Sequence, residues 1–350
     1  MIYLKTGTPG ASKTLNTIKE VCEDDVFSKR PIYYNNIKCL ALDLDFLNSF
    51  QGFFYTQYLR ECSDEEKDFL KDTIAFAHKE KRLVRMDEVP FLGSAYNDYY
   101  WLDNFKYWIK KLYSKKRIEQ CLNFIEFHEK IGYKIRVKQI KKFNLDWRKL
   151  DNPHNWYKLP AGSVIIIDEV QDYFGKRSAS AKAPEHIAEL NTHRHKGFDL
   201  ILITQDSSLL DYQAKACVNY HIHYKNIHGG EKVSRLESGA HFNVNSISER
   251  KNVQRQSVIR RDKKYYGSYY SAEMHTNKWR MPTMYKKLLI VIPILIAASA
   301  YGYNKVMNFE SIVKPTNSIS QTTKTINNEN KNEKLENNCV TFNSGKHYCV

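Results

Sequence analysis

The first fourteen residues, MIYLKTGTPGASKT (Met1 to Thr14), decide the fold that the sequence predicts. Ile2, Tyr3 and Leu4 are typical of a short buried strand. A loop containing glycine and proline follows, then Lys13 and Thr14, and the apolar spacing from Leu15 to Val21 predicts a helix. A strand, a glycine-containing loop, a Lys-Thr pair and a helix form the layout of a phosphate-binding P-loop.

Each part of this stretch has a predicted role in binding ATP and Mg²⁺. Backbone N–H groups of the loop and the helix N-terminus point toward anionic phosphate oxygens. Lys13 is expected to reach the β- and γ-phosphates, and the Thr14 hydroxyl is expected to bind Mg²⁺. The predicted nucleotide-binding residues are Gly7, Thr8, Pro9, Gly10, Ala11, Ser12, Lys13 and Thr14.

Ser12 departs from the usual pattern, which has glycine before the lysine. Glycine allows close backbone approach and a positive φ, whereas serine can bind anions but can also distort the loop. The alternative interpretation of this stretch is a Gly/Pro turn that carries an exposed lysine.

A second element, SVIIIDEVQDYF, spans Ser163 to Phe174. Its run of β-branched residues predicts a fully buried parallel strand that ends in two carboxylates. Asp168 is expected to hold Mg²⁺, and Glu169 to orient and polarise the attacking water, which favours hydrolysis over kinase chemistry. The alternative is a strand that meets an ordinary surface turn.

A third element, FDLILITQ, predicts a buried strand from Leu200 to Ile203. If this strand lies between those carrying Lys13 and Asp168, Gln205 at its tip can sense the γ-phosphate or position water. Arg194, in the preceding NTHRHKG segment, is a candidate arginine finger directed at a neighbouring subunit.

These elements predict an α/β fold with a mostly parallel sheet flanked by helices. One or two strands are expected within Pro31–Leu47, with strand-like alternation at Leu40–Phe46, and further strands or extended segments at Leu83–Pro90, Lys134–Lys142 and Val218–Tyr224. Helices are expected at Gln57–Lys81, Tyr113–Lys130, Glu185–Lys196 and Asp206–Cys217. The aromatic stretch from Tyr96 to Trp108 is expected in the core or at an interface.

The composition of the 350 residues allows a packed core, since 42% are apolar, and the net charge of +15 suits an anionic partner. The run from Arg250 to Lys264 is expected to form either a basic strand pair that faces lipid or DNA, or an exposed, solvated hairpin. Five cysteines are scattered without CxxC spacing, as in a reduced cytosolic domain. Cys339 and Cys349 lie close together near the C-terminus and could form a disulfide in an oxidising compartment.

An uncharged apolar run extends from Leu288 to Tyr303. Lysines crowd its N-terminal side, so the sequence predicts a membrane span with residues 1–285 in the cytoplasm and the tail outside it. A buried core helix or strand is the alternative. The expected organisation is a nucleotidase domain (1–285, with a basic pre-membrane segment at 250–285), a transmembrane helix (286–309), a flexible linker (310–338) and a small terminal element (339–350).

Four segments, in this order, resemble the zonula occludens toxin-like family, which includes inner-membrane assembly ATPases of filamentous bacteriophages. They are GTPGASKT, LPAGSVIIIDEVQDYF, HRHKGFDLILITQ and YYGSYYSAEMHT, the last just before the apolar run. The tail beyond residue 303 is similar only in type, as a flexible segment with paired cysteines.

The resemblance implies a membrane-anchored ATP hydrolase that drives phage assembly and export, in the host bacterial inner membrane with its C-terminus in the periplasm. It implies a homo-oligomer, with a ring expected, and coat proteins, phage single-stranded DNA and an outer-membrane secretin as partners. Two alternatives come from the residues themselves. Ser12 favours an envelope scaffold that binds nucleotide structurally or not at all, and the basic run at Arg250–Lys264 favours a single-stranded DNA anchor.

Overall fold

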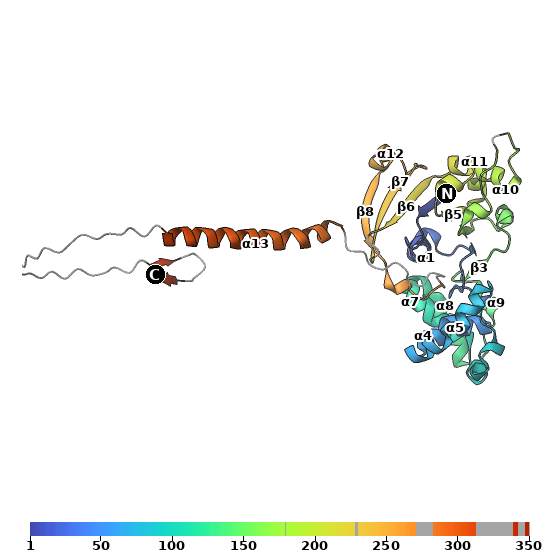
Figure 1. Cartoon of the computed structure of the whole chain (residues 1–350). Coiled ribbons are helices and arrows are strands. Elements are labelled where there is room, and N and C mark those ends of the chain that lie inside the picture. The colour runs from blue at the N-terminus through green and yellow to red at the C-terminus, as the bar shows by residue number, and fades with distance from the viewer. Residues whose placement is uncertain (179, 228–229, 271–282, 313–338, 342–346, 350) are drawn as a thin grey trace, which may run out of the picture. The chain divides into compact units, whose positions relative to one another are not determined.

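A computed structural model describes residues 1–350 except 179, 228–229, 271–282, 313–338, 342–346 and 350 (Figure 1). The chain divides into two compact units, Met1–Pro282 and Thr283–Val350. Each unit is described by itself below.

The first unit is built on an eight-stranded sheet with the strand order β3-β2-β4-β5-β1-β6-β7-β8. Pairing is parallel from β3 to β6 and antiparallel for β7 and β8. The strands are β1 (Ile2–Gly7), β2 (Ile32–Asn35), β3 (Trp147–Lys149), β4 (Val164–Ile167), β5 (Asp199–Thr204), β6 (Tyr220–Asn226), β7 (Lys232–Ser238) and β8 (Arg255–Arg260). The predicted α/β fold with a mostly parallel sheet is therefore confirmed, and β5 lies between β1 and β4.

Both faces of the central strands are covered, because alternate residues of one strand enter two different cores. Ile166 and Ile201 pack with apolar residues of α1 (Lys13–Glu23), α7 (Trp101–Leu112) and α8 (Lys115–Lys130). Ile165 and Leu200 pack on the other face with α10 (Glu185–Ala188) and the 3₁₀ helix Pro153–Lys158, which contains Trp156. Burial on both faces explains the continuous apolar runs that these strands show in the sequence.

A third, smaller core lies among the helices of residues 39–99. Its longest helix is α5 (Asp64–Lys79), which begins with a capping box between Ser63 and Glu66. Figure 1 shows α4, α5, α7, α8 and α9 gathered together. The remaining helices are α2 (Leu44–Leu47), α3 (Phe50–Phe53), α4 (Leu59–Glu61), α6 (Gly93–Asn97), α9 (Val137–Lys141), α11 (Tyr212–Ala216) and α12 (Ile247–Lys251).

Strand β2 confirms one strand within Pro31–Leu47, but three predicted extended segments are wrong. At Leu40–Phe46 the chain forms a turn and enters α2, because the Asp43 side chain accepts hydrogen bonds from the backbone N–H groups of Asp45 and Phe46. Residues 134–142 contain α9 in place of a strand. Residues 83–90 contain a 3₁₀ turn at Met86–Glu88, and a second turn begins at Pro90.

Other predictions are confirmed in whole or in part. The Tyr113–Lys130 helix is α8, and the aromatic stretch before it is core, with Trp101, Phe105 and Trp108 buried. The helix predicted at Glu185–Lys196 is broken into α10 and two 3₁₀ turns that end at Gly197, whose φ is 66°. The predicted Asp206–Cys217 helix is shorter and becomes α11, with a 3₁₀ turn before it.

The basic run from Arg250 to Lys264 contains one strand in place of the predicted strand pair. Arg250 and Lys251 end α12, Arg255–Arg260 form the exposed edge strand β8, and Lys263–Tyr265 form a 3₁₀ turn. Antiparallel β7 supplies the partner for β8. This run therefore lies at one edge of the sheet.

The second unit contains α13 (Thr283–Ile312) and a short antiparallel pair, β9 (Cys339–Thr341) and β10 (His347–Cys349). Among the described residues, one segment, Lys287–Lys305 of α13, is long and apolar enough to cross a membrane. In the β9–β10 pair, Cys339 is the register partner of Cys349. Most of the predicted flexible linker, residues 313–338, lies outside the described residues.

Candidate phosphate-binding site

The loop between β1 and α1 contains a tight turn at Thr8–Ala11. The Ala11 N–H donates to the Thr8 carbonyl at 3.1 Å, and Gly10 has a φ of 70°. A type II turn requires a positive φ at its third position and often has proline at its second, which explains the Pro9-Gly10 pair. The loop therefore curls back on itself before α1 begins at Lys13.

Lys13 lies against the inside of this loop. Its Nζ donates to the Gly7 carbonyl at 2.8 Å, and the residue is only 7% exposed. A simple Gly/Pro turn would carry an exposed lysine, so the burial of Lys13 contradicts that alternative interpretation. The loop geometry places a positive charge and the N-terminus of an eleven-residue helix beside each other, a combination that attracts anions.

Thr14 and Asp168 meet although they are 154 residues apart in the sequence. The Thr14 hydroxyl donates to Asp168 Oδ2 at 2.6 Å. Burial raises the pKa of the Asp168 carboxyl, and the hydrogen bond from Thr14 opposes that rise. A hydroxyl and a carboxylate in contact are oxygen ligands of the kind that Mg²⁺ prefers, so the residues present fit that ion.

Glu169 sits at the centre of a small polar network beside Asp168. Its backbone is left-handed, with φ 50°, and its N–H donates to Asp168 Oδ1 at 2.9 Å. Gln171 Nε2 donates to Glu169 Oε2 at 2.6 Å, and Gln205 Nε2 donates to Oε1 at 3.3 Å. The network fixes the Glu169 carboxylate at the carboxyl ends of β4 and β5.

Two members of this network were not predicted from the sequence. Thr204, fully buried at the end of β5, donates its hydroxyl to Gln171 Oε1 at 2.7 Å. Gln171 thereby joins β5 to Glu169. A polar residue two positions after the carboxylate pair is the sequence signal that could have identified Gln171.

The structure does not bring Arg194 to this site. Arg194 is exposed in the 3₁₀ turn at His193–Lys196, before β5 begins at Asp199. The site lies at the opposite, carboxyl end of β5. The suggestion that Arg194 acts on a neighbouring subunit therefore stays a prediction, and Arg194 has no place in its own chain's site.

Comparison with known proteins identifies relatives of this chain. Residues 109–275 match the family model described as zonular occludens toxin (Zot). The chain is 30% identical over 178 residues to a putative assembly protein, ORF301, of Pseudomonas phage Pf3. The chain is therefore Zot-like. This alignment covers 49% of the Zot-like chain and 58% of the phage protein.

Two solved structures are also similar to the Zot-like chain. The N-terminal domain of zonular occludens toxin from Neisseria meningitidis is 22% identical, with a TM-score of 0.40, covering 77% of this chain and 98% of that one. The DNA-packaging ATPase B204 of Sulfolobus turreted icosahedral virus is 13% identical, with a TM-score of 0.29, covering 73% and 95%. The Zot match includes Asp168, Glu169 and Gln205, whereas the phosphate loop lies before it.

Ser12 in this Zot-like chain adopts the backbone conformation that glycine prefers. Its φ is 67° and its ψ 30°, and its side chain makes no capping hydrogen bond to α1. Ser12→Gly is expected to raise the free energy of unfolding by about 1 kcal/mol, because a left-handed residue with a Cβ is strained.

Chemical denaturation of the full chain measures this difference. Ser114 is the matched control, since it also precedes a helix without a capping bond but has a φ of −73°. Ser114→Gly is expected to bring no gain. Equal effects of the two substitutions would show that Ser12 is not strained.

The other side of β1 contains a histidine pair that the sequence did not suggest. The Thr6 hydroxyl lies 2.8 Å from His221 Nε2 and 2.9 Å from His223 Nδ1. Burial lowers the pKa of His221 to about 3 and that of His223 to about 4, so both rings are neutral near pH 7. The pair ties β6 to the last residues of β1, directly before the phosphate loop.

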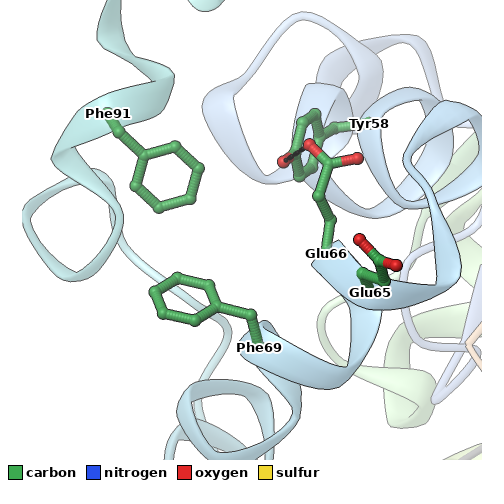
Figure 2. A pocket seen from close by; sticks show the side chains of 5 residues that line it. All are labelled: Tyr58, Glu65, Glu66, Phe69 and Phe91. Atoms are coloured by element: carbon green, nitrogen blue, oxygen red, sulfur yellow. Dashed lines mark hydrogen bonds between the residues drawn. The ribbon is translucent and has the colours of Figure 1, made fainter.

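A surface pocket elsewhere in the Zot-like chain shares no residue with this site. It is lined by Tyr58, Glu65, Glu66, Phe69 and Phe91. Figure 2 shows the rings of Phe69 and Phe91 near each other in an edge-to-face arrangement, and the hydrogen bond between Tyr58 and Glu66 beside them. Phe69 is 75% exposed, so the pocket is shallow, and it contains no group suited to phosphate binding.

Proposed function

We propose that the Zot-like chain is a P-loop nucleotidase that hydrolyses ATP with Mg²⁺ and works in phage assembly. The observation that carries the proposal is the hydrogen bond between Thr14 and Asp168. It joins the two halves of a nucleotidase site, one from the first loop of the chain and one from the end of β4. Lys13 and the Glu169 network flank this contact.

The proposed roles follow from the chemistry of each group. Loop N–H groups and Lys13 bind the phosphates, and the Thr14 and Asp168 oxygens hold Mg²⁺, which when bound neutralises phosphate charge. Glu169 orients a water molecule and accepts its proton. Gln205, which is hydrogen-bonded to Glu169, positions that water relative to the γ-phosphate.

The biological setting is part of the same proposal. A relative carries the name of a putative phage assembly protein, and α13 includes a segment that suits a membrane span. We therefore place residues 1–285 in the cytoplasm, a span at 286–309 in the host inner membrane, and the tail in the periplasm. Export through the envelope would be driven from the cytoplasmic side.

The partners would be further copies of the chain, coat proteins, phage single-stranded DNA and an outer-membrane secretin. A homo-oligomeric ring would let Arg194 reach a neighbour's site, because it is exposed and lies away from its own. Arg255 of edge strand β8 and Lys251 at the end of α12 are exposed and offer positive charge to an anionic partner such as DNA.

Lys13→Ala tests the nucleotide site directly. The full chain in detergent is titrated with a non-hydrolysable ATP analogue and Mg²⁺. Loss of charge-assisted hydrogen bonds to phosphate is expected to weaken binding about 30-fold. Lys110→Ala, at an exposed position in α7, is the control and is expected to bind as the unchanged chain does.

Two outcomes would contradict the proposal. If the unchanged chain does not bind the analogue, the nucleotidase function fails and the strained Ser12 backbone favours an envelope scaffold instead. If Lys13→Ala and Lys110→Ala bind equally well, nucleotide binds somewhere other than this loop.

A further inference from the structure

A short segment after β8 packs along the phosphate loop and the helix that follows it. Arg261 Nη2 donates to the Gly10 carbonyl at 2.6 Å. Lys19 Nζ donates to Asp262 Oδ2 at 2.9 Å, and the Tyr265 hydroxyl donates to Glu23 Oε1 at 2.9 Å. Residues 261–265, here called the α1 clasp, thus contact the loop, the middle and the end of α1.

The clasp is anchored firmly on its other side. Tyr265 is fully buried, and its hydroxyl also lies 3.1 Å from the Leu112 carbonyl of α7. The Arg261 N–H donates to the Glu231 carbonyl at 2.9 Å. The Arg261 guanidinium therefore approaches the phosphate loop from a fixed backbone.

The hydrogen bond from Arg261 to the Gly10 carbonyl affects how the loop directs its backbone N–H groups toward an anion. Gly10 is the left-handed residue of the Thr8–Ala11 turn, and its carbonyl is directed at Arg261. A loop that binds anions through N–H groups must hold its carbonyl oxygens away from the anion, since like partial charges repel. Arg261 stabilises that orientation with a charge-assisted hydrogen bond.

The Arg261 guanidinium also has an N–H group that is not used in a hydrogen bond within the described residues. Its Nε is buried and makes no hydrogen bond among the described residues. Buried donors without partners are uncommon, because leaving one unpaired costs free energy. The second positive charge near the loop, after that of Lys13, favours an anionic ligand there.

From these contacts we infer that Arg261 is a positioning residue of the phosphate loop, and that nucleotide binding and packing of the α1 clasp stabilise each other. The inference rests on the proposed function, since it concerns the same nucleotide. Coupling of this kind is reciprocal: if the clasp improves nucleotide affinity, bound nucleotide must stabilise the clasp to the same extent. The clasp is close in sequence to α13, which begins at Thr283.

The first test compares Arg261→Ala with Arg260→Ala in the full chain in detergent. Arg260 is the matched control, because it is exposed and its side chain makes no hydrogen bond or ion pair among the described residues. Arg261→Ala is expected to weaken binding of the Mg²⁺–ATP analogue about ten-fold and to raise KM similarly, with kcat changed less than about three-fold. Arg261→Lys keeps the charge and one donor, so it is expected to recover part of the affinity.

The second test measures hydrogen exchange at backbone amides 264–266, which lie in or directly after the clasp. Addition of the analogue is expected to slow exchange at these amides in the unchanged chain and in Arg260→Ala, and much less in Arg261→Ala. If the unchanged chain binds the analogue but Arg261→Ala matches Arg260→Ala in affinity and exchange, this inference is wrong and the proposed function stands. If the unchanged chain binds no analogue, both are wrong.

Discussion

Glu169→Gln is expected to reduce kcat for ATP by about 10²- to 10⁴-fold, the usual contribution of a general base. The substitution keeps the size of the side chain and its place beside Asp168, and removes only the group that can accept a proton. Gln171 and Gln205 both donate to the Glu169 carboxylate, so the unchanged network orients an acceptor. Phosphate release by the full chain at saturating ATP and Mg²⁺ measures the loss.

Binding separates this role from a structural one. Lys13 and Thr14 are unchanged in Glu169→Gln, so affinity for the ATP analogue is expected to stay within about three-fold of the original. Asp172→Asn is the control, because it changes an exposed carboxylate three residues away. If Glu169→Gln hydrolyses ATP at the rate of the control, Glu169 is not the general base of the reaction.

The contacts at the heart of the site could be predicted from the sequence because they follow from strand ends. Parallel strands present their carboxyl ends at one edge of a sheet, so groups directly after β1, β4 and β5 must gather there. Lys13, Thr14, Asp168, Glu169 and Gln205 are of this kind, and the structure places them together. Their roles in catalysis remain proposals that the substitutions above test.

Contacts that depend on long-range packing were not predictable in this way. Arg261 reaches Gly10 only because β7 and β8 extend the sheet beyond β6, and a run of basic residues gives no sign of which one turns inward. Lys5 is similar: it lies fully buried in β1 and pairs with Glu20 of α1 at 2.6 Å. Its neighbours Ile2 to Leu4 indicate a strand, but not a charged partner in α1.

Two of the wrong strand predictions have a local cause, a hydrogen bond that starts a helix. Alternation of leucine with small or acidic residues at Leu40–Phe46 has the period of a strand, but Asp43 caps helix α2 instead. Residues 134–142 alternate basic and apolar side chains, yet Gln139 closes the first turn of α9 by accepting from the Arg136 N–H. In both cases a hydrogen bond from a backbone N–H to a side-chain oxygen outweighed the pattern of hydrophobicity.

Gly7→Ala is expected to lower the free energy of unfolding by at least about 3 kcal/mol and to abolish binding of the ATP analogue. A Cβ at this position would lie 2.3 Å from the Tyr224 carbonyl oxygen, and Gly7 has a φ of 149° that residues with a side chain rarely adopt. Overpacking against backbone and strain in φ each cost about 1–3 kcal/mol. Relief requires β1 and β6 to separate where Gly7 and Tyr224 are register partners.

That separation would occur at the point from which the phosphate loop departs. The Gly7 carbonyl accepts from Lys13 Nζ, and the Gly7 N–H donates to the Gln205 carbonyl at 3.3 Å, so a displaced Gly7 moves both halves of the site. Gly93→Ala is the control, because a Cβ there would meet no atom within 4 Å and the residue is helical. It is expected to melt within a few degrees of the unchanged chain, and Gly7→Ala roughly 10 °C lower. A Gly7→Ala protein that melts with this control and binds the analogue normally would show that the loop does not depend on the close approach of β1 to β6.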